Sequence, residues 1–201
     1  MFSDLLNLPI DRDRLAQQDQ ILCLSGMAWS DYEQLTNEKT GYRIAYSDGI
    51  ITIVSPSLNH EKIAEIINGL VKTYCRKYDL LYFPMGSTTL KNPFTVGKEP
   101  DHSFCFEVEK DIPDLAIEVI FTRGGIADLQ KYKYLNVSEV WIWRDREISF
   151  YRLVDSEYVE TDYSYCLREL ASDFLIEFIN RGLTESPLTI EADFINRLNC
   201  R

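Results

Sequence analysis

The sequence lacks a long apolar run, paired cysteines and a basic leader. No apolar run reaches the roughly 20 residues that cross a bilayer, and the opening MFSDLLNLPIDRDR carries acids where a signal peptide carries bases. These absences predict a soluble, cytoplasmic protein. The five cysteines are scattered and form no CxxC pair, which excludes a disulfide framework and a cysteine zinc site as working hypotheses.

Basic residues are also few. The 21 lysines and arginines stand against 32 acids and give a formal net charge of −11. Nonspecific affinity for nucleic acid comes largely from the neutralisation of phosphates by Lys and Arg. The charge therefore counts against a freely acting DNA-binding protein.

What the chain does contain is a sizeable core. Its 201 residues are 45% hydrophobic, enough for one domain. Ser47-Asp48-Gly49 separates two apolar runs, and an Asp-Gly pair favours positive φ, so a hairpin is predicted at 42–46 and 50–54.

Helical spacing predicts helices at about 59–77 and 126–136 and two short ones in the tail from residue 173. Residues 91–99 read as a polar loop, and residues 1–24 as a short helix with extended ends. Further strands are expected at 80–83, 88–90, 101–108, 115–121, 140–143, 148–153 and 158–163. This order predicts a mixed α/β layer structure.

Two acids stand out on neighbouring runs. Residues 115–121 are almost continuously apolar, as in a strand buried on both faces, yet Glu118 lies inside them. A buried carboxylate is costly unless it is paired, hydrogen-bonded or bound to a cation. If residues 101–108 pair with this run as an antiparallel neighbour, Asp101 lies close to Glu118. His102 then points to the opposite face.

Two interpretations of these acids stay open at this point. Carboxylate and carbonyl oxygens are the ligands that Mg²⁺ and Mn²⁺ prefer, and such a metal can activate water against a phosphodiester. Alternatively, Glu118 forms a structural ion pair with Arg123, Lys91 or another base, because buried ion pairs use the same residue types.

Several strings together resemble a known family. SDGIITIVSPSLNHE, EPDHSFCF, PDLAIEV and GG...KY..L.VSEVWIW are similar to the bacterial Uma-two family, a restriction endonuclease-like domain of unknown function, over roughly residues 29–170. The resemblance implies the PD-(D/E)XK nuclease fold, a mixed β-sheet flanked by helices. We expect this domain at 25–170, an N-terminal extension at 1–24, and a helical tail at 171–201 packed on the domain.

The resemblance also implies a site. It places the family's two acids on Asp101 and Glu118, which with the carbonyl of Val119 would bind Mg²⁺ or Mn²⁺. Two lysine positions are occupied by other residues in this chain. Ile120 stands where the parent nuclease motif has its lysine, and Asp128 stands where the family has a lysine on the following helix.

A substitute for this lysine is therefore needed. Lys131, three residues on from Asp128, can reach back to the acids, although a single helix lysine is more often solvated. His60 matches a family histidine and is a candidate for substrate binding, as is Arg123, which can offset charge.

The leading hypothesis is a magnesium-dependent endonuclease that hydrolyses phosphodiester bonds in DNA. The alternative is a catalytically degenerate member of the same fold that acts as a binding or interaction module, because Asp128 replaces the helix lysine. A third interpretation makes the acids part of a salt-bridge network without metal. The resemblance mildly favours a homodimer.

Overall fold

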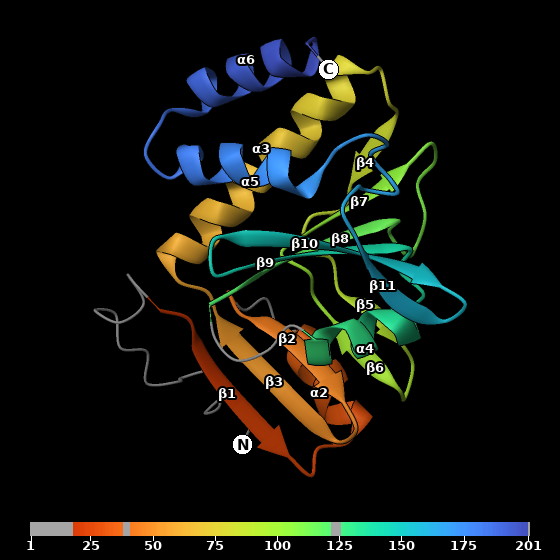
Figure 1. The fold of residues 1–201 in the computed structure, drawn as a ribbon. Coiled ribbons are helices and arrows are strands. Elements are labelled where there is room, and N and C mark those ends of the chain that lie inside the picture. Colours follow the sequence, from red (N-terminus) through yellow and green to blue (C-terminus); the bar gives the residue numbers. More distant parts are fainter. Residues whose placement is uncertain (1–17, 38–40, 122–125, 201) are drawn as a thin grey trace.

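Two β-sheets and five helices make up the part of the chain that the computed structural model describes, residues 18–37, 41–121 and 126–200 (Figure 1). The mixed α/β class predicted from the sequence is confirmed. Residues 1–17, which contain most of the segment predicted as a short helix with extended ends, lie outside the described residues. No helix within the described ranges is long and apolar enough to cross a membrane.

The larger sheet contains six strands: β4 (Tyr82–Pro84), β7 (His102–Phe106), β8 (Leu115–Ile120), β9 (Glu139–Arg144), β10 (Glu147–Val154) and β11 (Glu157–Thr161). They lie in the order β11–β10–β9–β8–β7–β4. β8 and β9 run parallel, whereas the other neighbours run antiparallel, so the sheet is mixed as expected. Every residue of β8 is buried, which accounts for its apolar sequence.

The smaller sheet contains five strands: β1 (Gln20–Ser25), β2 (Arg43–Ser47), β3 (Ile50–Ser55), β5 (Leu90–Asn92) and β6 (Val96–Lys98). Their order is β1–β3–β2–β6–β5, and all neighbours are antiparallel. The β2–β3 hairpin confirms the predicted turn, because Asp48 and Gly49 have φ angles of 52° and 74°.

Helices cover both sheets. α3 (Leu58–Lys77), α5 (Ser172–Gly182) and α6 (Pro187–Leu198) pack on one face of the larger sheet around Phe104, Trp141 and Phe178 (Figure 1). α2 (Trp29–Asn37) packs on the smaller sheet. α4 (Ile126–Leu135) joins the sheets, because its Tyr132 shares a core with Val96 of β6 and Ala116 of β8.

Two strands correct the expectations from sequence. β6 lies inside 91–99, which read as a loop, and it pairs Gly97 with Tyr46 of β2. These residues are far apart in the chain, so local patterns carry no signal for the pairing. β1 likewise forms a full strand by pairing with β3, where only an extended end was expected.

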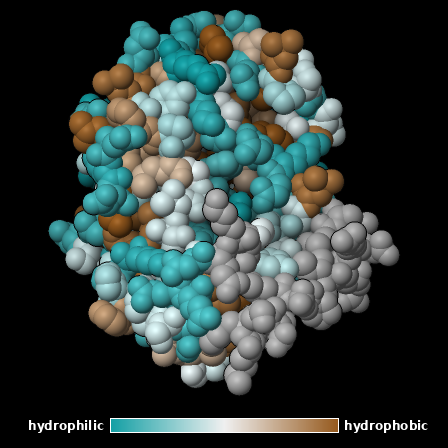
Figure 2. Space-filling view, turned by 180° about the vertical axis from the view of Figure 1, so that it is seen from behind, coloured by the Kyte–Doolittle hydropathy of each residue, from teal (hydrophilic) through white to brown (hydrophobic). Residues whose placement is uncertain are grey.

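The face opposite the view of Figure 1 is mainly hydrophilic. Its described hydrophobic residues form separate groups among hydrophilic ones (Figure 2). This part of the surface offers no broad apolar area, and the homodimer stays a prediction.

Gly97 is required by a close contact between α2 and the smaller sheet. A Cβ there would lie 2.1 Å from Cζ of Tyr32, a fully buried side chain. We expect Gly97→Ala to lower the free energy of unfolding by about 1–3 kcal/mol, as overpacking does. Urea denaturation measures this. Gly41→Ala is the control, because no atom of the described residues lies within 4 Å of its Cβ position. Equal midpoints for the two variants would contradict the prediction.

Candidate active site

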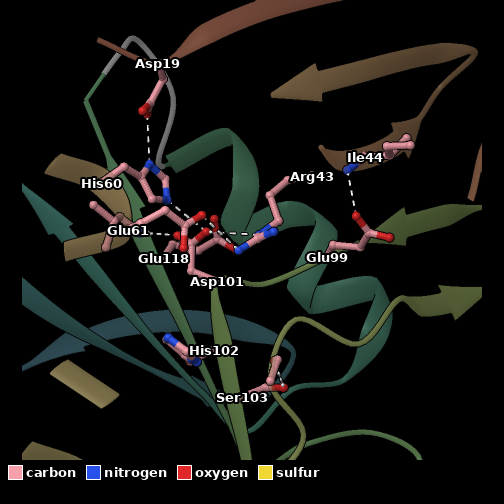
Figure 3. A network of polar contacts seen from close by, with 12 residues as sticks. Asp19, Arg43, Ile44, His60, Glu61, Glu99, Asp101, His102, Ser103 and Glu118 are labelled. Atoms are coloured by element: carbon pink, nitrogen blue, oxygen red, sulfur yellow. Dashed lines mark hydrogen bonds and ion pairs between the residues drawn. The ribbon is translucent and has the colours of Figure 1, made fainter. Parts of the chain in front are cut away.

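Asp101 and Glu118 converge at the end of the β7–β8 pair. His102 pairs with Ile117 in antiparallel register, which places Asp101 opposite Glu118 as the sequence predicted. Both acids line a pocket of about 230 Å³, and they are only 4% and 5% exposed. Figure 3 shows the two side chains close to each other. The pocket therefore places two carboxylates together in a largely dry environment.

Asp101 accepts one backbone hydrogen bond and lies in ion-pair contact with two basic side chains. Its Oδ2 accepts a hydrogen bond of 2.7 Å from the amide of Val119. Its Oδ1 lies 2.9 Å from Nε2 of His60 and 3.5 Å from Nε of Arg43. Burial favours the neutral acid, but His60 and the Val119 amide outweigh it and hold the pKa of Asp101 below its ordinary value. Asp101 is therefore a fixed, ionised carboxylate.

Glu118 contacts an ammonium and a phenol. Its Oε2 lies 3.0 Å from Nζ of Lys98, and its Oε1 accepts a hydrogen bond from the hydroxyl of Tyr132. Burial raises the pKa of Glu118 above its ordinary value, although the charge of Lys98 opposes that shift. A cation placed beside Glu118 would favour its ionised form.

Lys98 is the site residue that the sequence analysis missed. It ends β6, is 8% exposed, and extends from the smaller sheet to an acid of the larger one. Its Nζ also lies 4.0 Å from Oδ2 of Asp128. Burial opposes its charge, but Asp128 and Glu118 raise the pKa of Lys98 above the ordinary value. Lys98 is therefore an ammonium at neutral pH.

Other predicted residues lie at the rim of the pocket or outside it. Lys131 lines the pocket, and its Nζ lies 2.6 Å from Oδ1 of Asp128. Arg123 lies outside the described residues. His102 points away from the acids, as expected (Figure 3). Its Nε2 lies 3.3 Å from Oε1 of Glu65 in α3. His60, by contrast, contacts Asp101 directly.

The sequence analysis considered a structural ion pair between Glu118 and a buried base. Such an ion pair is present, and Lys98 is the base. Lys91 instead donates a 3.1 Å hydrogen bond to Oγ1 of Thr36. Lys98 also supplies the ammonium that position 128 lacks. The pocket therefore contains a lysine beside Glu118, although the family's helix position holds Asp128.

Comparison with known proteins identifies the family of this chain. The model of the family Uma2, described as "Putative restriction endonuclease", matches residues 29–184. The chain belongs to the Uma2 family. No curated protein matches it in sequence.

A solved structure resembles this Uma2 chain. The crystal structure of a "putative nuclease belonging to DUF820" from Anabaena variabilis covers 76% of this chain and 99% of its own, with a TM-score of 0.54 and 14% identity. At this identity the likeness concerns the fold alone. The restriction-endonuclease-like fold predicted from the sequence is thus confirmed.

The donor set of this Uma2 site suits a hard divalent cation. Asp101 and Glu118 offer carboxylate oxygens, and Mg²⁺ commonly binds through one or two carboxylates, with water and substrate oxygens completing its shell. Among the described residues, no three His, Cys, Asp or Glu side chains are grouped to hold a metal without such help. The acids therefore fit Mg²⁺ or Mn²⁺ as an open site, provided that the bound cation displaces some of the present donors.

His60 makes the stability of the metal-free protein depend on pH. Burial lowers the pKa of an imidazole, but Asp101 and Asp19 outweigh it and raise the pKa of His60 from 6.5 to about 10. A raised histidine pKa stabilises the fold fully below the unfolded value, and this contribution is lost as the pH rises towards 10. With EDTA present, we expect the stability advantage of wild type over His60→Gln to shrink by on the order of 2 kcal/mol between pH 6.5 and 9.

Urea denaturation at several pH values measures this difference. His102→Gln is the matched control, because burial lowers the pKa of His102 and its contribution weakens as the pH falls instead. An advantage over His60→Gln that is the same at pH 6.5 and pH 9 would contradict the prediction.

Proposed function

We propose that this protein is a magnesium- or manganese-dependent nuclease that hydrolyses phosphodiester bonds in DNA. The observation that carries the proposal is the meeting of Asp101, Glu118 and Lys98 in one buried pocket. Membership of a family described as "Putative restriction endonuclease" supports a nucleic-acid substrate. The divalent metal and the choice of DNA are the further steps that the experiment below tests.

Asp101, Glu118 and the carbonyl of Val119 would hold the cation. The side chain of Asp101 accepts a hydrogen bond from the Val119 amide, and the backbone amide of Asp101 donates one to the carbonyl of Ile117. In an extended strand the N–H and C=O of one residue point towards the same neighbour. The Val119 carbonyl therefore faces the edge on which Asp101 lies. Bound there, the metal would polarise the phosphodiester and lower the pKa of a bound water.

Lys98 stabilises charge and does not act as a base. Its raised pKa keeps it protonated, so it cannot accept a proton near neutral pH. A buried ammonium beside the acids is instead placed to offset the negative charge that develops on a phosphate in the transition state. We therefore assign to Lys98 the function that the sequence had suggested for Lys131, which remains at the rim with Asp128.

The pocket contains basic and acidic side chains together. Four basic residues, Arg43, His60, Lys98 and Lys131, line it beside five acids, Asp19, Glu99, Asp101, Glu118 and Asp128. A divalent cation bound to Asp101 and Glu118 would offset two of these negative charges, which would let the basic groups attract a phosphate. We infer that substrate affinity depends on the bound cation together with these four basic residues.

Calorimetry with Mn²⁺ and a plasmid nicking assay test this function. We expect the wild type to bind Mn²⁺ and to nick DNA only when Mg²⁺ or Mn²⁺ is present. Asp101→Asn and Glu118→Gln should each weaken Mn²⁺ binding at least about tenfold, whereas Glu65→Gln, at an exposed acid of α3, should not. A wild type that neither binds the cation nor cleaves, or variants that match it, would rule the proposal out.

A further inference from the structure

His60 bridges two carboxylates from different parts of the chain. Its Nε2 lies 2.9 Å from Oδ1 of Asp101, and its Nδ1 lies 2.9 Å from Oδ2 of Asp19 (Figure 3). All three side chains are almost fully buried: those of Asp19 and Asp101 are each 3% exposed, and that of His60 is 5% exposed. Nδ1 forms a hydrogen bond with Asp19, and Nε2 faces Asp101 in an ion-pair contact, so carboxylates on both sides restrict the position of the ring.

Asp19 also fixes the start of the helix that carries His60. Its Oδ1 accepts a 2.8 Å hydrogen bond from the amide of Ser57, the N-cap of α3. The hydroxyl of Ser57 in turn accepts a hydrogen bond from the amide of His60. One carboxylate thus holds both the backbone before His60 and its ring, which leaves the ring little freedom to turn away from Asp101.

The contacts continue beyond Asp101 into β8. Oδ2 of Asp101 accepts from the amide of Val119, so Asp19, His60, Asp101 and Val119 form one continuous chain of polar contacts. Asp19 directly precedes β1 and lies outside residues 29–184, the part that matches the family. A residue beyond the family's matched region is therefore joined to an acid of the site.

We propose that Asp19 is a positioning residue, which orients Asp101 for cation binding by holding His60. The inference rests on the proposed function in one respect, namely that Asp101 holds the cation. A carboxylate behind a histidine commonly fixes the ring, and loss of such an outer partner typically costs about 10–100-fold in metal affinity. Asp19 occupies this place with respect to Asp101.

The test compares Asp19→Ala with a matched control in the full chain. The protein has two histidines, and each faces a carboxylate on or near α3, so Glu65→Gln removes the exposed partner of His102 and leaves His60 untouched. Two measurements apply: the NMR shift of the Val119 amide without metal, which reports the orientation of Asp101, and the Mn²⁺ affinity by calorimetry. Asp19→Asn, which keeps an acceptor for the Ser57 amide, serves if Asp19→Ala does not fold.

We expect Asp19→Ala to move the Val119 amide resonance and to weaken Mn²⁺ binding about tenfold or more, with no such change in Glu65→Gln. Added to His60→Gln, it should have little further effect, because both act through the same contact. A folded Asp19 variant with an unmoved Val119 amide and wild-type Mn²⁺ affinity would overturn the inference, as would full additivity with His60→Gln. If wild type binds no Mn²⁺, the proposed function fails, and the Val119 shift still decides whether Asp19 positions Asp101.

Discussion

Replacing Lys98 by methionine should reduce metal-dependent DNA cleavage by about 10²–10³-fold, the usual cost of losing one group that stabilises developing charge. The methionine keeps the length of the side chain but removes the ammonium that lies 3.0 Å from Glu118. Single-turnover cleavage at saturating Mn²⁺ measures the effect. The affinity for Mn²⁺ should not weaken, because a competing cation is removed from a carboxylate of the site.

Two further variants sharpen this result. Lys91→Met removes a lysine of the adjacent strand β5 that contacts Thr36 and should leave cleavage unchanged. Asp128→Lys alone should impair cleavage, since Nζ of Lys98 lies 4.0 Å from Oδ2 of Asp128 and would lose a favourable charge. Combined with Lys98→Met, it returns a lysine to the family's helix position and should recover part of the rate. Undiminished cleavage by Lys98→Met would contradict the assignment of Lys98.

Glu139→Ala should destabilise the fold by about 3–5 kcal/mol, because removing one acceptor leaves several buried donors unsatisfied at about 1–3 kcal/mol each. Glu139 is fully buried in β9. Its carboxylate accepts hydrogen bonds from the Trp141 indole, the Ser164 hydroxyl and the amides of Tyr165 and Cys166. It therefore fastens the segment before α5 to the centre of the larger sheet.

Urea denaturation followed by circular dichroism measures this loss. Glu147→Ala is the control, because Glu147 begins the next strand but is exposed, and surface substitutions usually change stability by less than about 0.5 kcal/mol. The stability of Glu139→Gln should lie between those of Glu139→Ala and Glu147→Ala. The amide keeps one oxygen acceptor, but its NH₂ group faces donors that the second carboxylate oxygen had accepted from. Equal midpoints for Glu139→Ala and Glu147→Ala would show that this hydrogen-bonded cluster contributes little.

The local structure and the two acids of the site could be predicted from the sequence. The Asp48-Gly49 turn, the long helix α3 and the buried run around Glu118 each have a periodicity or turn signal within a few neighbouring residues, and each forms as predicted. The resemblance placed Asp101 beside Glu118, and the antiparallel register agrees. These features depend on short-range patterns or on motif order.

Lys98 and Asp19 could not be found in this way. Lys98 reaches Glu118 because a three-residue strand, β6, pairs with β2, and that pairing depends on contacts distant in sequence. Asp19 reaches His60 because β1 pairs with β3. The one available signal was Asp128, an acid at a family lysine position, which indicated that another lysine must substitute. Lys131 on the same helix is the nearest candidate in sequence, whereas the lysine proposed as the substitute, Lys98, lies three residues before Asp101.

The division of the pocket between two sheets has a consequence for how the protein can be shortened or recombined. The larger sheet carries both acids, and the smaller sheet carries the ammonium on β6. A fragment or chimera that kept only the larger sheet would retain a pair of like charges without their counter-ion. The proposed site therefore lies at the junction of the two sheets, and neither sheet can be exchanged for an unrelated one without rebuilding that junction.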